Sequence, residues 1–187
     1  GESHPTPEAQ NLRGKPIRHY DEAGALKSES YDFKGNPLET QRRLAQAFTA
    51  ATDWTPLAAT NTPSAIDAAA ASLLETETFT QTRTFDALNR IASATEPDLT
   101  EIKPRYNQRG LLDKVEARVR NAATWTPFVD DLQYDAKAQR QSIDYGNGTQ
   151  TAYQYDELTY RLLHLTTTRT SPSNTLQDLS YTFDPVG

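Results

Sequence analysis

The chain has 187 residues and a formal net charge of −6, with a sequence pI near 5.1, which disfavours nucleic acid as its main partner. It contains no Cys, so neither a disulfide framework nor a thiolate site is available. Leu, Ile, Val and Phe together number only 33, but 9 Tyr, 2 Trp and 25 Thr add bulk that favours strands. The composition therefore predicts an ordered, strand-rich chain with a thin or one-sided core. No run approaches the roughly 20 apolar residues of a membrane span.

The start of the chain, GESHPTPEAQ, lacks the basic and then apolar pattern of a signal peptide. Residues 1–16 are expected to be a disordered leader or an artificial chain boundary. Residues 17–187 are expected to form one sheet segment built from repeats, with an insertion at about 49–78.

The strongest pattern is an aromatic residue followed by Asp or Asn, which occurs seven times. From Phe85 onward the successive aromatic residues are 21, 28, 21 and 28 positions apart. The aromatic residue is suited to pack on one face of a strand, the Asp or Asn to accept a hydrogen bond from the backbone two residues on, and a Gly to supply a positive φ. The pattern therefore predicts a mainly β fold of successive antiparallel hairpins. The residues assigned to the repeat turns are Tyr20, Asp21, Gly24, Tyr31, Asp32, Gly35, Phe85, Asp86, Tyr106, Asn107, Gly110, Tyr134, Asp135, Gly146, Asn147, Gly148, Tyr155, Asp156, Phe183 and Asp184.

The hairpin at 139–155 has a predictable register. A three-residue Gly146-Asn147-Gly148 loop puts Tyr145 opposite Thr149, Ile143 opposite Thr151 and Gln141 opposite Tyr153. All apolar residues at odd positions then share one face. A two-residue loop would pair Tyr145 with Gln150 and move Tyr153 and Tyr155 to the other face.

One stretch near 64–75 is expected to be a short helix within the insertion. Ser64 is a candidate N-cap, with Asp67 three residues on. Helical spacing joins Ile66, Ala69, Ala70, Leu73 and Leu74. The segment 38–48 fits either a strand or a helix, and its place after a turn favours a strand. Trp54 and Trp125 share a Trp-Thr-Pro motif and are interpreted as anchors that hold loops on the sheet, or alternatively as aromatic ligand contacts.

The sequence contains no pattern that points to catalysis. His4, His19 and His164 are far apart, and no Gly-x-Ser-x-Gly, phosphate loop or His-x-x-x-His motif occurs. The acidic group Asp130, Asp131 and Asp135 lacks any indication of a cleft. We therefore expect no enzyme activity, no cofactor and no metal site.

The motifs resemble the RHS/YD-repeat family, and the phrases YDFKGNPLE, FDALNRIAS, IDYGNGTQTAYQYD and YTFDPVG most resemble the YD-repeat region of bacterial insecticidal toxin-complex B and C components. The resemblance covers roughly residues 17–187. The chain departs from the family pattern in having Phe at 85 and 183, Asn at 107, and Leu99 where Gly is usual. The final DPVG is interpreted as the turn of a further repeat, with a processing site as the alternative.

The resemblance implies a spiralling β-sheet shell of a secreted toxin that encloses a toxic cargo domain. The expected partners are neighbouring YD repeats of the same full-length protein or a partner toxin-complex subunit, the enclosed toxin domain, and further copies of the chain through open sheet edges. Neither nucleic acid nor a membrane span is expected. The alternative function is an extracellular binding or adhesion module that recognises a glycan or a cell-surface protein through exposed Tyr and Trp.

Overall fold

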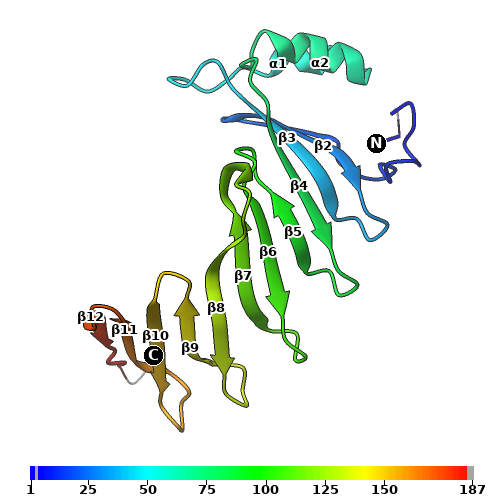
Figure 1. Ribbon diagram of the computed structural model, residues 1–187. Coiled ribbons are helices and arrows are strands. Elements are labelled where there is room, and N and C mark those ends of the chain that lie inside the picture. The colour runs from blue at the N-terminus through cyan, green and yellow to red at the C-terminus, as the bar shows by residue number, and fades with distance from the viewer. Residues whose placement is uncertain (3, 185–187) are drawn as a thin grey trace. The chain divides into compact units, whose positions relative to one another are not determined.

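The computed structural model describes residues 1–2 and 4–184, and the chain divides into two units, Gly1–Leu99 and Thr100–Gly187. In each unit the strands pair with their chain neighbours and run antiparallel, so the order in space is the order in sequence (Figure 1). The mainly β, antiparallel fold expected from the repeat is confirmed. No described helix has both the length and the apolar character that crossing a bilayer requires.

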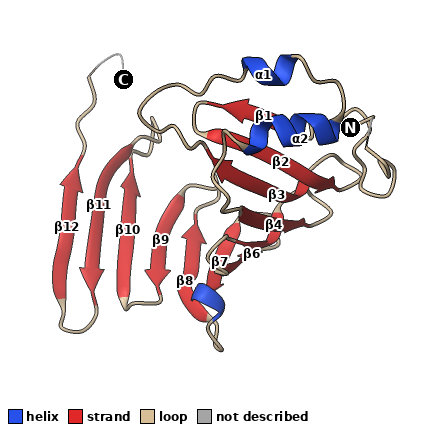
Figure 2. Cartoon of the chain, turned by 90° about the horizontal axis from the view of Figure 1, so that it is seen from above, coloured by secondary structure: helices blue, strands red, loops and turns tan. Residues whose placement is uncertain are grey.

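The first unit holds five strands and two helices. Its strands are β1 (Arg18–Asp21), β2 (Gly24–Tyr31), β3 (Pro37–Leu44), β4 (Phe79–Phe85) and β5 (Ile91–Thr95). The helices α1 (Thr55–Ala58) and α2 (Pro63–Ala71) lie between β3 and β4 in the chain. Figure 2 shows α2 near β1 and β2.

The second unit holds seven strands in one continuous meander. They are β6 (Glu101–Tyr106), β7 (Leu112–Arg118), β8 (Thr126–Tyr134), β9 (Arg140–Tyr145), β10 (Thr149–Tyr155), β11 (Leu162–Arg169) and β12 (Asn174–Ser180). A 3₁₀ turn, η1 (Val119–Asn121), follows β7. Every residue of β12 is exposed, and within the described residues only β11 pairs with it. One edge of this unit is therefore open.

The core of the second unit consists mainly of a row of side chains that crosses neighbouring strands. Leu132, Ile143 and Thr151 are 5 %, 6 % and 4 % exposed. Leu132 pairs with Ile143, and Ile143 pairs with Thr151. The row continues to Thr167, whose hydroxyl lies 2.9 Å from that of Thr151. Ala117, 6 % exposed, is buried apart from this row. Few side chains of the unit are therefore buried, as expected for the thin core that the low apolar content predicts.

The register predicted for the β9–β10 hairpin is confirmed. Tyr145 pairs with Thr149, and Ile143 pairs with Thr151. Gly148 has φ +76°, and the backbone N–H of Thr149 donates to the side-chain oxygen of Asn147 at 3.1 Å. Gly146 is needed for a different reason, because a Cβ there would lie 1.8 Å from the carbonyl oxygen of Pro127. The predicted pairing of Gln141 with Tyr153 lies beyond the paired part of this ladder.

The insertion corrects two details of the expected helix. The N-cap is Thr62 and not Ser64, since the Thr62 side chain accepts from the backbone N–H of Ala65 and Pro63 opens the first turn. The helix ends at Ala71 and not near 75. The residues expected to form its last turn instead pair with the chain just after β3, where Leu74 forms a β-bridge with Ala45. Tertiary pairing there outweighs helical periodicity.

Three further expectations concern the first unit. The strand interpretation of 38–48 is confirmed as far as Leu44. A second helix, α1, was not expected. Residues 1–16 were expected to be a disordered leader or an artificial boundary. Residues 4–16 contain a series of turns, in which Leu12 is 1 % exposed and the carbonyl oxygen of Gln10 accepts from the backbone N–H of Tyr31.

Trp54 anchors its loop on the sheet, as the first of the two interpretations predicted. Its indole N–H donates to the carbonyl oxygen of Asp21 at 3.1 Å, and its ring lies 5.0 Å from that of Tyr20. Trp125 is half-buried and takes the ammonium of Lys103 over its ring, 4.0 Å from the centroid.

Candidate functional site

The repeat turns share one hydrogen-bond pattern, best followed at Asp32. Its carboxylate oxygen Oδ1 accepts from the backbone N–H groups of Lys34 and Asn36, at 2.9 and 2.8 Å. Its backbone carbonyl accepts from Gly35 and its N–H donates to Asn36. One side chain therefore satisfies two N–H groups of a loop that reverses the chain within a few residues.

The same four contacts recur at Asp86, Asn107 and Asp135. At Asp156 the turn is one residue longer, and Oδ1 accepts from the N–H groups of Leu158 and Thr159. Asn107 shows that a neutral amide oxygen makes the same contacts as a carboxylate, so the geometry of the turn does not require a charge.

Each of these turns places one residue in the left-handed region, with φ between +61° and +93°. These residues are Gly35, Asn89, Gly110, Ala138 and Tyr160. Leu99 adopts the same conformation, with φ +65°, three residues after Glu96. The backbone conformation is thus kept even where the expected Gly is missing, although left-handed φ costs an L-residue about 1–2 kcal/mol.

Replacing Ala138 by Gly is expected to raise the free energy of unfolding by about 0.5–1 kcal/mol, because relief of the left-handed strain exceeds the added entropy of Gly. Gly110→Ala, at the equivalent position with φ +80°, is the matched control and should destabilise by a similar amount. Urea denaturation measures both. A loss of stability in Ala138→Gly would contradict the strain that we assign to this position.

The two ends of the repeat differ from this pattern. Asp21 and Gly24 form the last pair of the β1–β2 ladder, which leaves a two-residue loop. Asp21 accepts from the N–H of Ala23 at 2.9 Å and from the guanidinium of Arg42, so it also joins strands. Phe183 and Asp184 follow β12 outside any strand, and Gly187 lies outside the described residues, as does most of DPVG.

Two of the repeat aromatics bind the backbone of the segment that precedes their own hairpin. Tyr31 is 6 % exposed and its hydroxyl donates to the carbonyl oxygen of Pro16 at 2.6 Å. The Tyr134 hydroxyl donates to the backbone carbonyl oxygen of Leu112 at 2.8 Å. A register shift separates the aromatic from the residue before it, as between Gln133 and Tyr134. The aromatic is thus the last paired residue before the turn, and the bulge before it sets the direction of its side chain.

The spacing of the repeat also has a structural explanation. All described turns of this pattern follow an even-numbered strand, from β2 to β10, so within each unit they lie at the same end of the hairpins. The spacings of 21 include the short connections at 96–100 and 146–148. The 28-residue spacing from Tyr106 to Tyr134 instead includes the longer connection at 119–125.

Successive turns are also joined to one another, which the sequence did not reveal. In the first unit, Lys34 Nζ donates to the carbonyl oxygen of Ala87 and Asn36 donates to the side-chain oxygen of Asn89. In the second unit, Arg109 donates to the carbonyls of Asp135 and Ala136, at 2.8 and 3.0 Å. Lys34 and Arg109 both lie two residues after the Asp or Asn of their turn. Both donate to the carbonyl oxygen of the residue that follows the Asp of the next turn, Ala87 or Ala136. A Lys or Arg at this position of the repeat was the feature of the sequence that could have indicated the contact.

Backbone hydrogen bonds lower the pKa of two turn carboxylates. For Asp86 the largest contribution is the N–H of Arg90, and for Asp156 it is the N–H of Thr159. Because each folded-state pKa lies below the unfolded value of about 3.9, the stabilisation is complete above that value. It is lost as the pH falls through the folded-state pKa.

The double variant Asp86→Asn and Asp156→Asn is therefore expected to show a smaller fall in stability between pH 5 and pH 3 than the unaltered chain. Asn keeps the acceptor, as Asn107 does, but it does not titrate. Urea midpoints at the two pH values measure the effect. An equal fall in both proteins would show that these carboxylates do not contribute to acid sensitivity.

The other polar groups singled out from the sequence are not gathered into a reactive centre. Asp130 lies 3.7 Å from the ammonium of Lys114, and Asp131 accepts from Gln133 at 2.5 Å. His164 pairs with Asp178 across β11 and β12. Within the described part of the chain, no three or more His, Asp or Glu side chains group as metal ligands would.

The fold and turns thus define a class of protein, namely an open antiparallel meander built from repeated aromatic–acidic turns. No family model matches the chain. It is 30 % identical to "Toxin subunit YenC2" of Yersinia entomophaga over 97 % of its own length, and 30 % identical to "Toxin subunit YenC1" of the same organism over 96 %. The chain spans only 19 % and 18 % of the length of these relatives.

Solved structures give the same result. The chain superposes with a TM-score of 0.83 and 29 % identity on a "TcdB2-TccC3" crystal structure and on a Tc holotoxin pore of Photorhabdus luminescens, covering 98 % of this chain and 8 % of either one. These likenesses confirm the resemblance that the repeat turns indicated. In sequence and in fold, the chain matches the YD-repeat region of toxin-complex subunits.

Proposed function

We propose that this chain is a structural segment of an RHS/YD-repeat shell of a secreted bacterial toxin, and that the shell encapsulates a toxic cargo domain. The segment acts as wall and does no catalysis. Its partners are the neighbouring YD repeats of the full-length protein or a partner subunit, together with the enclosed domain. The full-length protein acts outside the cell that makes it.

The observation that carries this proposal is the recurrence of one turn geometry in both units, with successive turns joined by Lys34 in one and Arg109 in the other. An enzyme gathers distinct groups at one place, whereas here the same groups recur along the chain. The carboxylate oxygens of the turn aspartates accept hydrogen bonds from backbone N–H groups, so these side chains are poorly placed to act as acids or bases. The similarity to toxin subunits supports the same conclusion.

Protease protection of the full-length protein tests containment. A domain that follows the repeats should survive added protease while it is enclosed, and it should be cleaved faster when the wall is opened by Leu132→Asp, which places a charge in the buried row. Arg105→Gln is the control, since this side chain is 65 % exposed. Equal cleavage in the unaltered and Leu132→Asp proteins would contradict a containing wall.

A second candidate function is recognition of a glycan by tyrosines that are partly or fully exposed. Tyr153, Tyr155 and Tyr160 line a hollow of about 280 Å³, together with Glu157 and the amide of Gln141. Rings that offer a flat apolar face beside hydrogen-bonding groups suit a sugar. Binding of the chain to a glycan array, abolished by Tyr153→Ala and kept by Tyr181→Ala, would support this function. Absence of saturable binding to any glycan would exclude it.

A further inference from the structure

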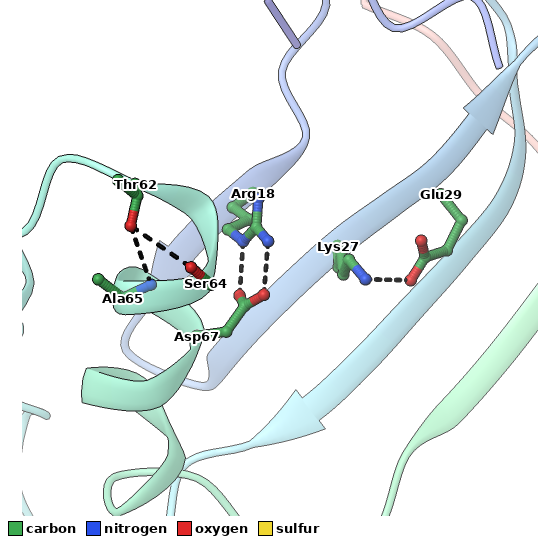
Figure 3. Close-up of polar contacts among 7 residues, drawn as sticks. All are labelled: Arg18, Lys27, Glu29, Thr62, Ser64, Ala65 and Asp67. Carbon is green, nitrogen blue, oxygen red and sulfur yellow. Dashed lines mark hydrogen bonds and ion pairs between the residues drawn. The ribbon is translucent and has the colours of Figure 1, made fainter. Parts of the chain in front are cut away.

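The insertion between β3 and β4 is a described part of the first unit that the repeat does not explain. After Leu44 the chain leaves the meander, forms α1 and α2, and returns at Phe79. Arg18 of β1 and Asp67 of α2 point toward one another and form two hydrogen bonds of 2.6 Å (Figure 3). The helix is therefore fixed over the strands and not loosely tethered.

A cavity of about 330 Å³ lies between α2 and the first three strands. Part of its lining is apolar and includes Leu26, Ala70 and Leu74, of which the last two are 2 % and 3 % exposed. Pockets that hold small molecules run from about 300 to 1,000 Å³ and combine apolar walls with a few placed polar groups. The cavity meets the lower end of this range.

The charged groups of the lining leave one cation unpaired. Asp67 neutralises Arg18, and Glu29 lies 2.6 Å from the ammonium of Lys27 (Figure 3). The remaining charge is Arg43. Its Nε donates to the carbonyl oxygen of Glu75 at 2.8 Å, and its two Nη groups have no hydrogen-bond partner among the described residues.

Tyr20 adds a neutral donor to the same lining. Its hydroxyl has no hydrogen-bond partner in residues 1–2 and 4–184, and burial, more than the charge of Asp67, raises its pKa. The Tyr20 ring also packs against the ring of Trp54 in the insertion, with the centroids 5.0 Å apart. A guanidinium fork and a fixed hydroxyl thus line a chamber with an apolar wall. This arrangement complements an anion that carries an apolar group.

We propose that this cavity binds a small organic carboxylate, with the carboxylate on Arg43 and Tyr20 and its apolar chain against Leu26, Ala70 and Leu74. The ligand would join the insertion to the strands, because its contacts come from both. The site would give the insertion a role separate from the wall. The proposal does not depend on the proposed function of the repeats.

Isothermal titration of the chain with octanoate, octanol and inorganic phosphate tests the site. Saturable binding of octanoate that exceeds the binding of both other probes is the expected result, since only octanoate has charge and chain together. Equal binding of octanol would show a merely apolar cavity, and equal binding of phosphate would show a merely basic surface. Either outcome, or no saturable binding of octanoate, would overturn the proposal.

Variants locate the site. Arg43→Gln is expected to weaken octanoate binding about tenfold or more, since it removes a charge-assisted hydrogen bond, while Arg43→Lys should retain part of the affinity. Arg105→Gln, distant in the sequence and 65 % exposed, should bind as the unaltered chain does. Unchanged binding in a folded Arg43→Gln would refute the assignment. If that variant does not fold, the three-probe comparison on the unaltered chain decides the matter alone.

Discussion

Replacing Leu132 by Ala is expected to lower the free energy of unfolding by about 2–3 kcal/mol, which makes it the most damaging truncation in the second unit. Leu132 is 5 % exposed and pairs with Ile143, which is 6 % exposed, so the lost methyl groups leave a gap in the buried row. A one-row core has few neighbours that could move in to fill it. Urea or thermal denaturation followed by far-UV circular dichroism measures the loss.

Leu158→Ala is the control for this truncation. The same atoms are removed from a side chain that is 88 % exposed at the tip of a repeat turn. Its effect should stay within about 0.5 kcal/mol. Comparable losses in the two variants would mean that the row across β8, β9 and β10 is not the core of this unit.

Asp135→Ala is expected to cost about 1–3 kcal/mol, because it removes the acceptor of two backbone N–H groups at once. Those groups belong to Lys137 and Gln139, at 2.8 and 2.9 Å. The turn also receives Arg109 from the preceding hairpin. Increased amide hydrogen exchange should therefore appear at 107–111 as well as at 135–139.

The conservative variant separates the acceptor from the charge. Asp135→Asn should cost less than about 1 kcal/mol, because Asn107 makes the same backbone contacts in the neighbouring turn. Equal losses for Asp135→Ala and Asp135→Asn would show that charge holds the turn. No loss in either would remove the turn from the elements that specify the fold.

The parts of the fold that were predictable are those set by local chemistry. Asp or Asn before a tight turn, with Gly at the left-handed position, predicted the hairpins, and side-chain alternation set the register of Tyr145 opposite Thr149. The left-handed residue was predictable only where it is Gly. Ala138 and Tyr160 adopt the same conformation because the hydrogen bonds around the turn impose it.

The parts that were not predictable depend on contacts between segments distant in sequence. Helix α2 stops early because Leu74 bridges to Ala45, a contact that periodicity does not register. Asp67 was expected to help cap its helix but instead binds Arg18, 49 residues away in the sequence. The cavity that we propose as a carboxylate site is likewise formed by residues from β1, β2, β3 and α2, so no short sequence motif predicts it.

Electron cryomicroscopy of the full-length protein tests the central claim most directly. The account predicts that residues 17–184 form part of the wall of a hollow shell, with β12 paired along its open edge to the next strand of the repeat. A map in which this stretch forms a closed globule of its own, with nothing paired to β12 and no enclosed chamber, would contradict it.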